Sequence, residues 1–446
     1  MTDLVTISKM HNTTSIKMRK QKLRLLKEKI LLNEEKICEA LKADLGKSEF
    51  ESYMTEIGLV LKEISFLSKK LEKLLKKKKV KTPLAQFKAT SNIYYKPYGN
   101  VLVLSPWNYP FLLSLEPLLG AYAAGNSVVL KPSEYSAATS NVIKEILESV
   151  FAQNEVVTIL GDATVSQELL AQPFDYIFFT GSSRVGQIVY EMAAKNLTPV
   201  TLELGGKSPV LVDGTYDLAL TARRIVFGKF LNAGQTCVAP DYLIVKEDVK
   251  EELIKALIEE MQRQFKNALK SDSYGKIISR KHFDRLVNFI AKDDLIYGGN
   301  YEVASLKIEP TLLNASLSSS VMQEEIFGPI LPILTYQKEE DIERILGSIK
   351  TPLAFYIFSS DKHRQEYWLE KYEYGGATVN DTVVHLASNL PFGGFKNSGL
   401  GSYHHEYTLY TFLHETSVLK RGKLDLNMRY QPYSKKNLRI IKKLLK

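Results

Sequence analysis

The sequence predicts an α/β protein with two doubly wound parallel-sheet domains. From about residue 93, short β-branched runs alternate with helical segments, which is typical of βα units in a parallel sheet. The alternation starts again after Gly205, so we expect a second α/β domain to begin there. The length of 446 residues and the hydrophobic content of 45% allow each domain its own core.

Two helical stretches precede the first strand. Residues 17–45 are expected to form one long amphipathic helix, because apolar residues recur at helical spacing at Leu23, Leu26, Ile30, Ile37 and Leu41. Cys38 falls within this pattern and is expected to be a half-buried core thiol. Residues 51–79 predict a second helix that ends in a lysine run. We interpret that run as a solvated helix end rather than a site for an anionic partner.

The alternating elements form two sets. In the first set, the expected strands are 101–104, 128–131, 156–160, 176–180 and 200–203, with helices at 116–125, 136–151 and 185–194. The second set has strands near 210–212 and at 242–245, with helices near 218–231 and at 250–267.

The net charge of +9 comes mainly from two short stretches of the chain. Residues 69–81 carry eight lysines and residues 429–446 carry seven Lys or Arg, whereas the charges elsewhere nearly balance. We therefore expect no nucleic-acid partner. Two cysteines in so long a chain exclude a disulfide framework and favour a cytoplasmic location. Residues 1–10 lack the features of a signal peptide, and no window has the roughly 18 apolar residues of a membrane span.

A glycine-containing turn follows the strand at 176–180. Gly181, Ser182 and Gly186 lie where a strand leads into a helix, and the free N–H groups of such a turn attract phosphate. Because Ser183 replaces the middle glycine of the dinucleotide motif, an ordinary strand–turn–helix remains an alternative.

Two roles are open for Glu203. It lies seventeen residues after Gly186 at a strand end, where an acid can bind the adenosine ribose of a dinucleotide. It also opens the segment ELGGKSP at the expected domain junction, where active sites form, so it could be a catalytic base. Spacing alone does not decide between these roles.

Cys237, in NAGQTCVAP, is a candidate nucleophile. No histidine lies within forty residues of it on either side, so a carboxylate would have to serve as the base. Asn108, in LSPWNYP, follows a strand, and its amide could donate to a developing oxyanion. A turn before Pro110 is the alternative explanation for this asparagine. The segment KPSE at 131–134 places polar groups at a strand end, where parallel sheets bind cofactors.

Seven motifs in order resemble the aldehyde dehydrogenase superfamily over about residues 95–415. They are PWNYP (106–110), KPSE (131–134), FTGSSRVG (179–186), LELGGKSP (202–209), NAGQTC (232–237), EEIFGP (324–329) and PFGGFKNSGLG (391–401). The short N-terminus and the segment GSYHH after the last motif resemble the class 3 branch, which acts on fatty and aromatic aldehydes.

This resemblance implies a catalytic role for three residues. Cys237 would attack the aldehyde carbonyl to give a thiohemiacetal, and the Asn108 side chain with the Cys237 N–H would hold the oxyanion. Loss of hydride to a nicotinamide would leave a thioester. Glu203 would activate the water that hydrolyses it, so the resemblance favours the base over the ribose ligand.

The resemblance also implies NAD as the cofactor, with NADP accepted as well, and no metal site. The implied cofactor contacts are Lys131 and Glu134 at the adenosine ribose, Gly181, Ser182 and Gly186 at the pyrophosphate, and Glu325, Phe327 and Trp107 around the nicotinamide end. We expect Glu134 to repel a 2′-phosphate and Lys131 to tolerate one. Glu324 and Phe392 are expected to be structural.

The resemblance further implies a domain plan and a partner. Tyr109 and Tyr53 would line a substrate funnel, although a core tyrosine is the alternative for Tyr53. No Arg or Lys is positioned to clamp a charged group, so we expect apolar aliphatic or aromatic aldehydes.

A hairpin at 85–100 would pair with the C-terminal part of the partner subunit in a homodimer. The expected units are 1–84 with 101–204 (NAD(P)-binding), 205–400 (catalytic), and 85–100 with 401–446 (a small β oligomerisation and bridging element with a basic tail).

Three alternatives remain open. A relative that passes the thioester to coenzyme A is disfavoured by Glu203, and a non-catalytic scaffold is disfavoured by the intact Cys237, Glu203 and Asn108.

The C-terminal KKNLRIIKKLLK has apolar residues on one helical face opposite lysines. Such a helix could touch an anionic membrane surface, or it could be an ordinary surface helix, but it is too short and charged to span.

Overall fold

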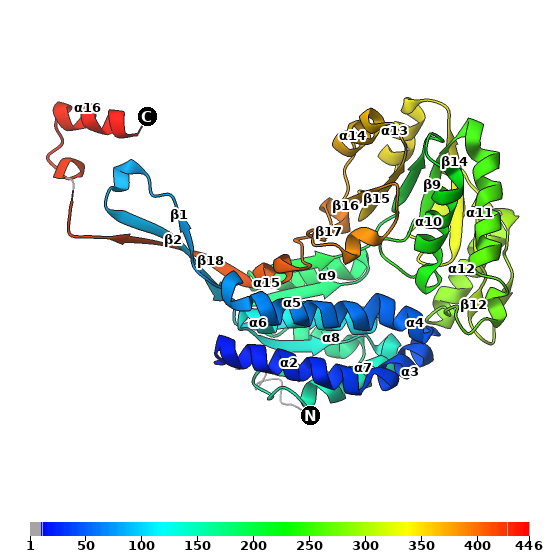
Figure 1. Cartoon of the computed structure of the whole chain (residues 1–446), viewed down its shortest axis with the longest axis horizontal. Coiled ribbons are helices and arrows are strands. Elements are labelled where there is room, and N and C mark those ends of the chain that lie inside the picture. The colour runs from blue at the N-terminus through cyan, green and yellow to red at the C-terminus, as the bar shows by residue number, and fades with distance from the viewer. Residues whose placement is uncertain (1–9, 11, 426, 446) are drawn as a thin grey trace.

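The computed structural model describes residues 10, 12–425 and 427–445. The chain forms two lobes and an arm (Figure 1). Each lobe is built on a largely parallel sheet, and the arm is a small antiparallel sheet, so the predicted fold class is confirmed. Except for Met10, the N-terminal segment in which we expect no signal peptide lies outside the described residues.

The first lobe contains a six-stranded sheet in the order β17-β7-β6-β3-β4-β5. Its strands are β3 (Asn100–Leu104), β4 (Ser127–Lys131), β5 (Val156–Thr158), β6 (Tyr176–Thr180), β7 (Val200–Glu203) and β17 (Gly399–Leu400). All pairings are parallel except β17 with β7. The five strands expected in this region are confirmed, and their continuous burial is typical of a parallel sheet covered on both faces.

The helices of the first lobe differ from prediction near the N-terminus. They are α2 (Ile16–Leu32), α3 (Glu34–Leu45), α4 (Glu49–Ser52), α5 (Gly58–Leu74), α6 (Pro110–Ala124), α7 (Ala137–Glu148), α8 (Ala163–Leu170) and α9 (Ser183–Ala194). The single helix expected over 17–45 is wrong. It breaks at Asn33, whose side-chain amide donates to the carbonyl of Lys29 and ends α2.

The second expected helix, 51–79, is also corrected. A π-helical turn at Tyr53–Ile57 separates α4 from α5, and the helix ends at Leu74. The lysine run is therefore not a helix end, because Lys78 and Lys79 form strand β1 (Lys78–Val80) and pair with a neighbouring strand. Cys38 is half-buried against the core, as expected.

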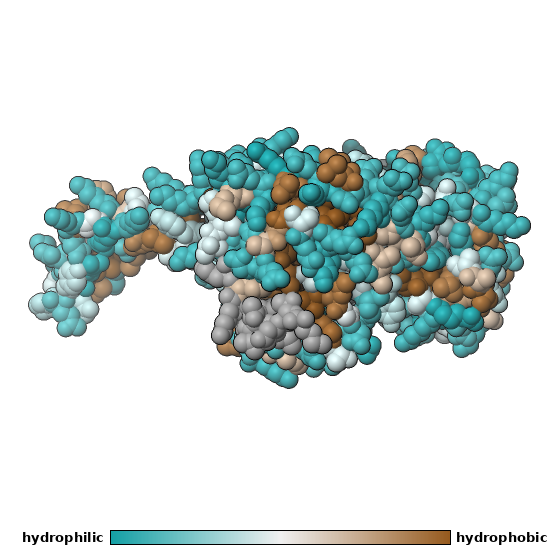
Figure 2. All heavy atoms as spheres, turned by 90° about the horizontal axis from the view of Figure 1, so that it is seen from below, coloured by the Kyte–Doolittle hydropathy of each residue, from teal (hydrophilic) through white to brown (hydrophobic). Residues whose placement is uncertain are grey.

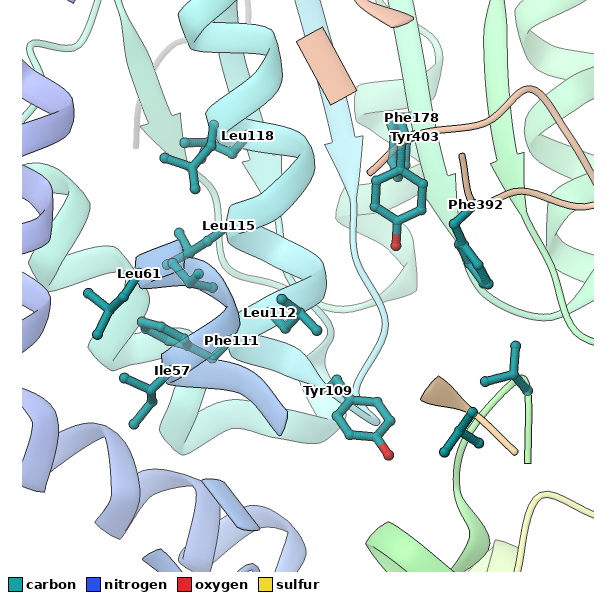
Figure 3. Close-up of a cluster of buried hydrophobic side chains, with 14 of the residues drawn as sticks. Ile57, Leu61, Tyr109, Phe111, Leu112, Leu115, Leu118, Phe178, Phe392 and Tyr403 are labelled. Atoms are coloured by element: carbon teal, nitrogen blue, oxygen red, sulfur yellow. The ribbon is translucent and has the colours of Figure 1, made fainter. Parts of the chain in front are cut away.

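Helix α6 runs through the middle of the first lobe. It begins at Pro110, six residues before the expected start, because proline is well tolerated in the first turn of a helix. Figure 3 shows Phe111, Leu112, Leu115 and Leu118 of this helix among the buried side chains of the lobe.

The second lobe contains a seven-stranded sheet in the order β10-β13-β14-β9-β8-β15-β16. Its strands are β8 (Pro209–Val212), β9 (Tyr242–Lys246), β10 (Asp294–Tyr297), β13 (Thr311–Asn314), β14 (Ile330–Tyr336), β15 (Ala354–Phe358) and β16 (Gly376–Val379). Its helices are α10 (Leu218–Phe230), α11 (Lys250–Gln264), α12 (Arg280–Lys292), α13 (Glu339–Gly347) and α14 (Lys362–Lys371). The two strands and two helices expected here are confirmed.

The arm consists of β1, β2 (Ala89–Pro97) and β18 (Leu413–Arg421), with β2 in the middle. The expected hairpin region thus pairs with the C-terminal part of its own chain, over the full length of β18. Two strands lie outside the units in which their residues were expected. Strand β1, in the expected NAD(P)-binding range 1–84, belongs to the arm, and β17, in the expected catalytic range 205–400, belongs to the first sheet. Helix α15 (Glu406–Thr411) precedes β18, and α16 (Lys435–Leu444) lies beyond the end of the arm (Figure 1).

The face of the molecule seen in Figure 2 is largely hydrophilic, with hydrophobic patches between the hydrophilic residues on the lobes and on the arm. Within the described part of the chain, none of the helices combines the length and the apolar character needed to cross a bilayer.

Candidate active site

The carboxyl ends of four strands in the first sheet lie at one edge. Leu104 at the end of β3 is in register with Lys131 of β4 and with Phe179 of β6, and Thr180 is in register with Glu203 of β7. The turns that carry Asn108, Gly181 and Ser182 therefore start from this same edge, which also presents Lys131 and Glu203. In open α/β sheets this edge is where ligands bind.

The second sheet contributes the amino ends of two neighbouring strands. Residues 232–237 lead into β9, residues 324–329 lead into β14, and these two strands pair directly. The two segments touch, since a Cβ atom on Gly234 would lie 2.2 Å from the carbonyl oxygen of Gly328. Gly234 also has a φ of 76°, so both its space and its backbone require glycine. Cys237 and Glu325 are thereby brought to one edge.

Hydrogen bonds join Asn108 and Tyr109 to the segment that carries Cys237. Asn108 is buried, and its Nδ2 donates to the carbonyl oxygen of Gln235 at 3.1 Å. The hydroxyl of Tyr109 lies 2.6 Å from Oγ1 of Thr236. Asn108 is therefore anchored two residues from Cys237, although 127 residues separate Asn108 from Gln235 in sequence.

A buried ion pair fixes the turn that contains Asn108. Lys47 is fully buried, and its Nζ lies 2.5 Å from Oε1 of Glu56 and 3.4 Å from the carbonyl oxygen of Asn108. The second oxygen of Glu56 accepts hydrogen bonds from the N–H groups of Phe111 and Leu112, at the start of α6. Buried charges need partners of this kind, so the pair holds the turn and the helix start together. Sequence analysis did not identify Lys47 or Glu56.

The thiol of Cys237 is half-buried and is protonated at neutral pH. Burial, followed by the charges of Glu325 and Glu203, raises its pKa to about 12, and the N–H groups of Cys237 and Val238 act in the opposite direction. Since only the thiolate is strongly nucleophilic, reaction at this sulfur requires removal of its proton.

The carboxyl of Glu203 has no hydrogen-bond partner among the residues that the structure describes. Its exposed fraction is 2%, and neither Oε1 nor Oε2 is paired within the described part of the chain. Burial, and then the charge of Glu116, raise the pKa of Glu203 well above the usual range of a glutamate. Leaving such a group unpaired costs stability, which is typical of residues kept for chemistry.

Glu325 approaches the link between the two sheets. A Cβ atom on Gly205 would lie 2.2 Å from Oε2 of Glu325, so only glycine admits the carboxyl here. Burial raises the pKa of Glu325 to about 8. Two residues on, the ring of Phe327 meets that of Trp107 edge-on, with centroids 5.4 Å apart.

The residues expected at the dinucleotide fit such a ligand. Ser182 is the N-cap of α9 and accepts a hydrogen bond from the N–H of Val185, so the N-terminus of a helix lies at this turn, where a pyrophosphate could bind. A Cβ atom on Gly186 would lie 2.5 Å from Leu204, hence glycine lets α9 approach that segment closely. Nζ of the buried Lys131 lies 3.0 Å from Oε2 of Glu134, which places a cation and an acid together after β4.

Tyr53 differs from the other expected site residues. It lies on the π-helical turn and is 44% exposed, whereas Tyr109 is buried. The contacts that join Tyr109 to the segment before Cys237 have no counterpart at Tyr53 among the described residues. Its place in a substrate funnel stays a prediction.

Three residues near Glu203 were missed by sequence analysis, namely Glu116, Tyr403 and His404. Glu116 is a buried acid in the otherwise apolar run FLLSLEPLLG, and that contrast was the signal available. Tyr403 is buried, and its hydroxyl is within electrostatic reach of Glu116, Glu203 and Cys237. No sequence signal connects it to them.

Two doubly wound sheets that bring a cysteine and an unpaired glutamate to their facing edges define a dinucleotide-dependent oxidoreductase. The chain belongs to the aldehyde dehydrogenase family, whose sequence pattern matches residues 7–418. The predicted membership, including the class 3 branch, is confirmed by this match and by the relatives.

Two relatives and one solved structure are similar over nearly their whole lengths. A 4,4′-diaponeurosporen-aldehyde dehydrogenase of Staphylococcus aureus is 46% identical, covering 95% of this chain and 94% of that protein. Aldehyde dehydrogenase family 3 member H1 of Arabidopsis thaliana is 43% identical, covering 93% and 87%. The substrate-bound structure of Staphylococcus aureus AldH superposes with a TM-score of 0.95 at 44% identity, covering 99% of this chain and 97% of that one.

Asn108→Ala is expected to lower kcat by about 100-fold or more, because in its predicted role Asn108 donates to the oxyanion. Steady-state kinetics with a saturating aldehyde would measure this loss. Asn141→Ala, which removes an exposed amide on α7, is the matched control. An Asn108→Ala enzyme with unchanged kcat would contradict the assignment.

The reaction rate is expected to rise with pH between about pH 6 and 9. In the predicted roles, the thiolate of Cys237 and the carboxylate of Glu203 are the reactive forms, and burial raises the pKa of both groups. Each lost proton then increases the active fraction by up to about tenfold per pH unit. Measuring kcat/KM across this range in overlapping buffers tests the sign, and a rate that falls with pH would contradict it.

Proposed function

We propose that this enzyme oxidises apolar aldehydes to carboxylic acids through a thioester on Cys237. The observation that carries the proposal is the anchoring of Asn108 beside the segment of Cys237, by the 3.1 Å bond between the two lobes. A carboxyl with no partner, Glu203, lies within electrostatic reach of the same sulfur.

In the proposed reaction, Cys237 loses its proton to the Glu203 carboxylate, its Sγ attacks the carbonyl carbon, and the oxygen becomes an oxyanion. Nδ2 of Asn108 already donates one hydrogen to Gln235, so its second hydrogen remains for the oxyanion. The N–H of Cys237 supplies a second donor. Each donor contributes about 3 kcal/mol to transition-state stabilisation.

A bound nicotinamide dinucleotide would accept a hydride in this reaction. Gly181, Ser182 and Gly186 would hold its pyrophosphate, and Glu325, Phe327 and Trp107 would surround its nicotinamide end. Hydrolysis of the remaining thioester needs a water deprotonated by Glu203. Separating oxidation from hydrolysis divides one difficult reaction into two easier ones.

We propose that NAD is favoured over NADP. Glu134 is 39% exposed on its side chain and lies beside Lys131, so its carboxylate would repel a 2′-phosphate near the adenosine ribose. Lys131 partly offsets this repulsion, which leaves some use of NADP.

The substrate class follows from the side chains around Asn108. Tyr109, Leu112, Phe392 and Tyr403 are all buried, and Figure 3 shows Tyr109 and Leu112 at the start of α6 with Phe392 and Tyr403 to one side of it. The Staphylococcus aureus relative is named for an aldehyde, 4,4′-diaponeurosporen-aldehyde, and shares 46% identity with this chain. Aliphatic or aromatic aldehydes fit these surroundings better than charged ones.

One assay tests the proposed function. Purified protein is mixed with hexanal or benzaldehyde and either NAD or NADP, and the absorbance of the reduced nicotinamide is followed. We expect a signal with both aldehydes, larger with NAD. Mass spectrometry should find the free acid even when coenzyme A is added, whereas an acyl-CoA product would identify the acyl-transferring alternative. No signal with any aldehyde would favour a scaffold.

We also propose a homodimer in the cytoplasm. The outer strands of the arm, β1 and β18, each pair on one side only, so the arm has edges that a second subunit can use. The two cysteines are both free, which suits a reducing compartment. Light scattering of the purified protein measures the subunit number, and a monomer at micromolar concentration would contradict the dimer.

Helix α16 is proposed to contact anionic membrane surfaces. It buries none of its residues, and its apolar side chains remain exposed, among them Leu438 (51%) and Leu444 (38%). We expect the full chain to sediment with phosphatidylglycerol vesicles at low salt, and residues 1–429 to stay in solution. Phosphatidylcholine vesicles are the control. Equal sedimentation of both chains would remove the proposal.

A further inference from the structure

A small cavity lined by both apolar and charged side chains lies between α5, α6 and the segment after β16. Its volume is about 40 Å³, and it is lined by Leu59, Lys62, Glu63, Glu116, Leu386, Ser388, Asn389, His404 and His405. Lys62 and Asn389 on its rim are exposed, whereas Glu63, Glu116 and His404 are buried. A water molecule needs about 10–15 Å³ of such space and several polar neighbours, so this cavity can hold water.

Glu116 and His404 form a hydrogen-bonded pair at the inner wall of this cavity. Nδ1 of His404 lies 2.9 Å from Oε1 of Glu116, and both residues have exposed fractions below 10%. Oε2 of Glu116 has no partner in the described part of the chain, nor does Oε1 of Glu63 on α5. The pair therefore has an unused oxygen on a buried carboxyl, which can accept a further proton.

The pair is connected to Glu203 by the chain itself. Gly399 of β17 is in register with Glu203, and the segment that follows reaches α6 four to five residues later, at Tyr403 and His404. Figure 3 shows Tyr403 between Phe178 and Phe392, across from α6. The charge of Glu116 acts on both the carboxyl of Glu203 and the hydroxyl of Tyr403.

We propose that Glu116 and His404 are positioning residues that relay the proton of thioester hydrolysis from Glu203 to solvent through this cavity. The proposal rests on the proposed function, because it assumes that Glu203 is the base. It gives a role to a buried acid and a buried histidine that the aldehyde chemistry itself does not use.

The relay balances as a simple proton transfer. Water adds to the thioester carbon, one of its protons goes to the Glu203 carboxylate, and the C–S bond breaks to release the acid and the Cys237 thiolate. Glu203 then passes the proton to Oε2 of Glu116, the proton on Oε1 of Glu116 moves to Nδ1 of His404, and Nε2 of His404 releases its proton to water in the cavity. Exchange with water returns the pair to its starting protonation. Nothing is oxidised or reduced, and no further reactant is needed.

The groups around the pair allow this transfer. Glu63 on α5 faces Glu116, and burial together with the charge of Glu116 raises the pKa of Glu63, so it adds no negative charge at neutral pH. Burial and His404 lower the pKa of His385 to about 4, so its ring is neutral. Lys62 and His405 lie at the rim, where water screens them.

Two conservative variants separate a relay from a structural role. His404→Asn keeps an amide donor at the position of Nδ1 but cannot carry a proton, and Glu116→Gln keeps the size of the side chain. In rapid mixing with hexanal and NAD, we expect both variants to form about one reduced nicotinamide per site, as the wild type does. The following steady-state rate, which then reports hydrolysis, should fall about tenfold or more.

Chemical rescue gives a readout that a structural role would not move. His404 has a φ of 78°, so His404→Gly fits the backbone and opens space for imidazole. Added imidazole should raise the steady-state rate of His404→Gly in proportion to its concentration and leave the wild type unchanged. His363→Asn, at an exposed position on α14, is the control for the substitution itself.

The outcomes distinguish the two proposals. Wild-type steady-state rates in both conservative variants would overturn the relay, as would a slow His404→Gly that imidazole does not rescue. A wild-type protein that forms no reduced nicotinamide with any aldehyde would instead overturn the proposed function.

Discussion

Cys237→Ala is expected to abolish aldehyde oxidation completely. The substitution removes the sulfur that would attack the aldehyde in the proposed reaction, and a thioester cannot form without it. The loss should exceed about 10⁴-fold, since the covalent route itself disappears. Reduced nicotinamide should not form even in the first turnover.

The chain offers a matched control in Cys38→Ala. Cys38 lies half-buried on α3, and Cys38 and Cys237 are the two cysteines of the sequence. This variant should keep wild-type kcat and KM. After inactivation by iodoacetamide, peptide mass spectrometry should find the modification that tracks activity loss at Cys237. Residual oxidation by Cys237→Ala above a hundredth of the wild-type rate would disprove its role as nucleophile.

Glu203→Gln is expected to spare the first turnover and block the following ones. The amide cannot take a proton from water, so the thioester should persist while the oxidation that precedes it continues. We expect about one reduced nicotinamide per subunit, then a steady-state rate lower by about 100-fold or more. Intact mass spectrometry should show the acyl group on the protein.

Glu203→Gln should also be at least as stable as the wild type at alkaline pH. The folded pKa of Glu203 is raised, so the folded state holds its proton where the unfolded state has lost it. Glu203 therefore stabilises the folded state at low pH. This stabilisation is lost as the pH rises from about 4.3, the pKa of a glutamate in the unfolded chain, through the raised pKa of the folded state. For this stability measurement, Glu324→Gln, which changes an exposed acid, is the control.

For the catalytic prediction, full turnover by Glu203→Gln would exclude Glu203 as the base.

Much of the fold could be predicted because local patterns determine buried strands. The five strands of the first set are apolar, β-branched runs between polar turns, and such runs form strands wherever a parallel sheet buries them. The wrong predictions concern the two N-terminal helices, which break where the periodicity of apolar residues continues. Asn33 ends α2 through its own amide, and the turn at Tyr53–Ile57 adopts π-helical bonding that periodicity does not reveal.

The sequence by itself determined the two sheets, the motifs and the residue types available for chemistry. Only the tertiary structure decided which of those residues act on one another. Asn108 bonds the segment of Cys237, and Glu203 lies within electrostatic reach of that cysteine, because the carboxyl end of one sheet lies next to the amino end of the other. The pKa values of Glu203 and Cys237, and the pairing of Glu116 with His404, depend on burial and on neighbouring charges, which exist only once the chain has folded.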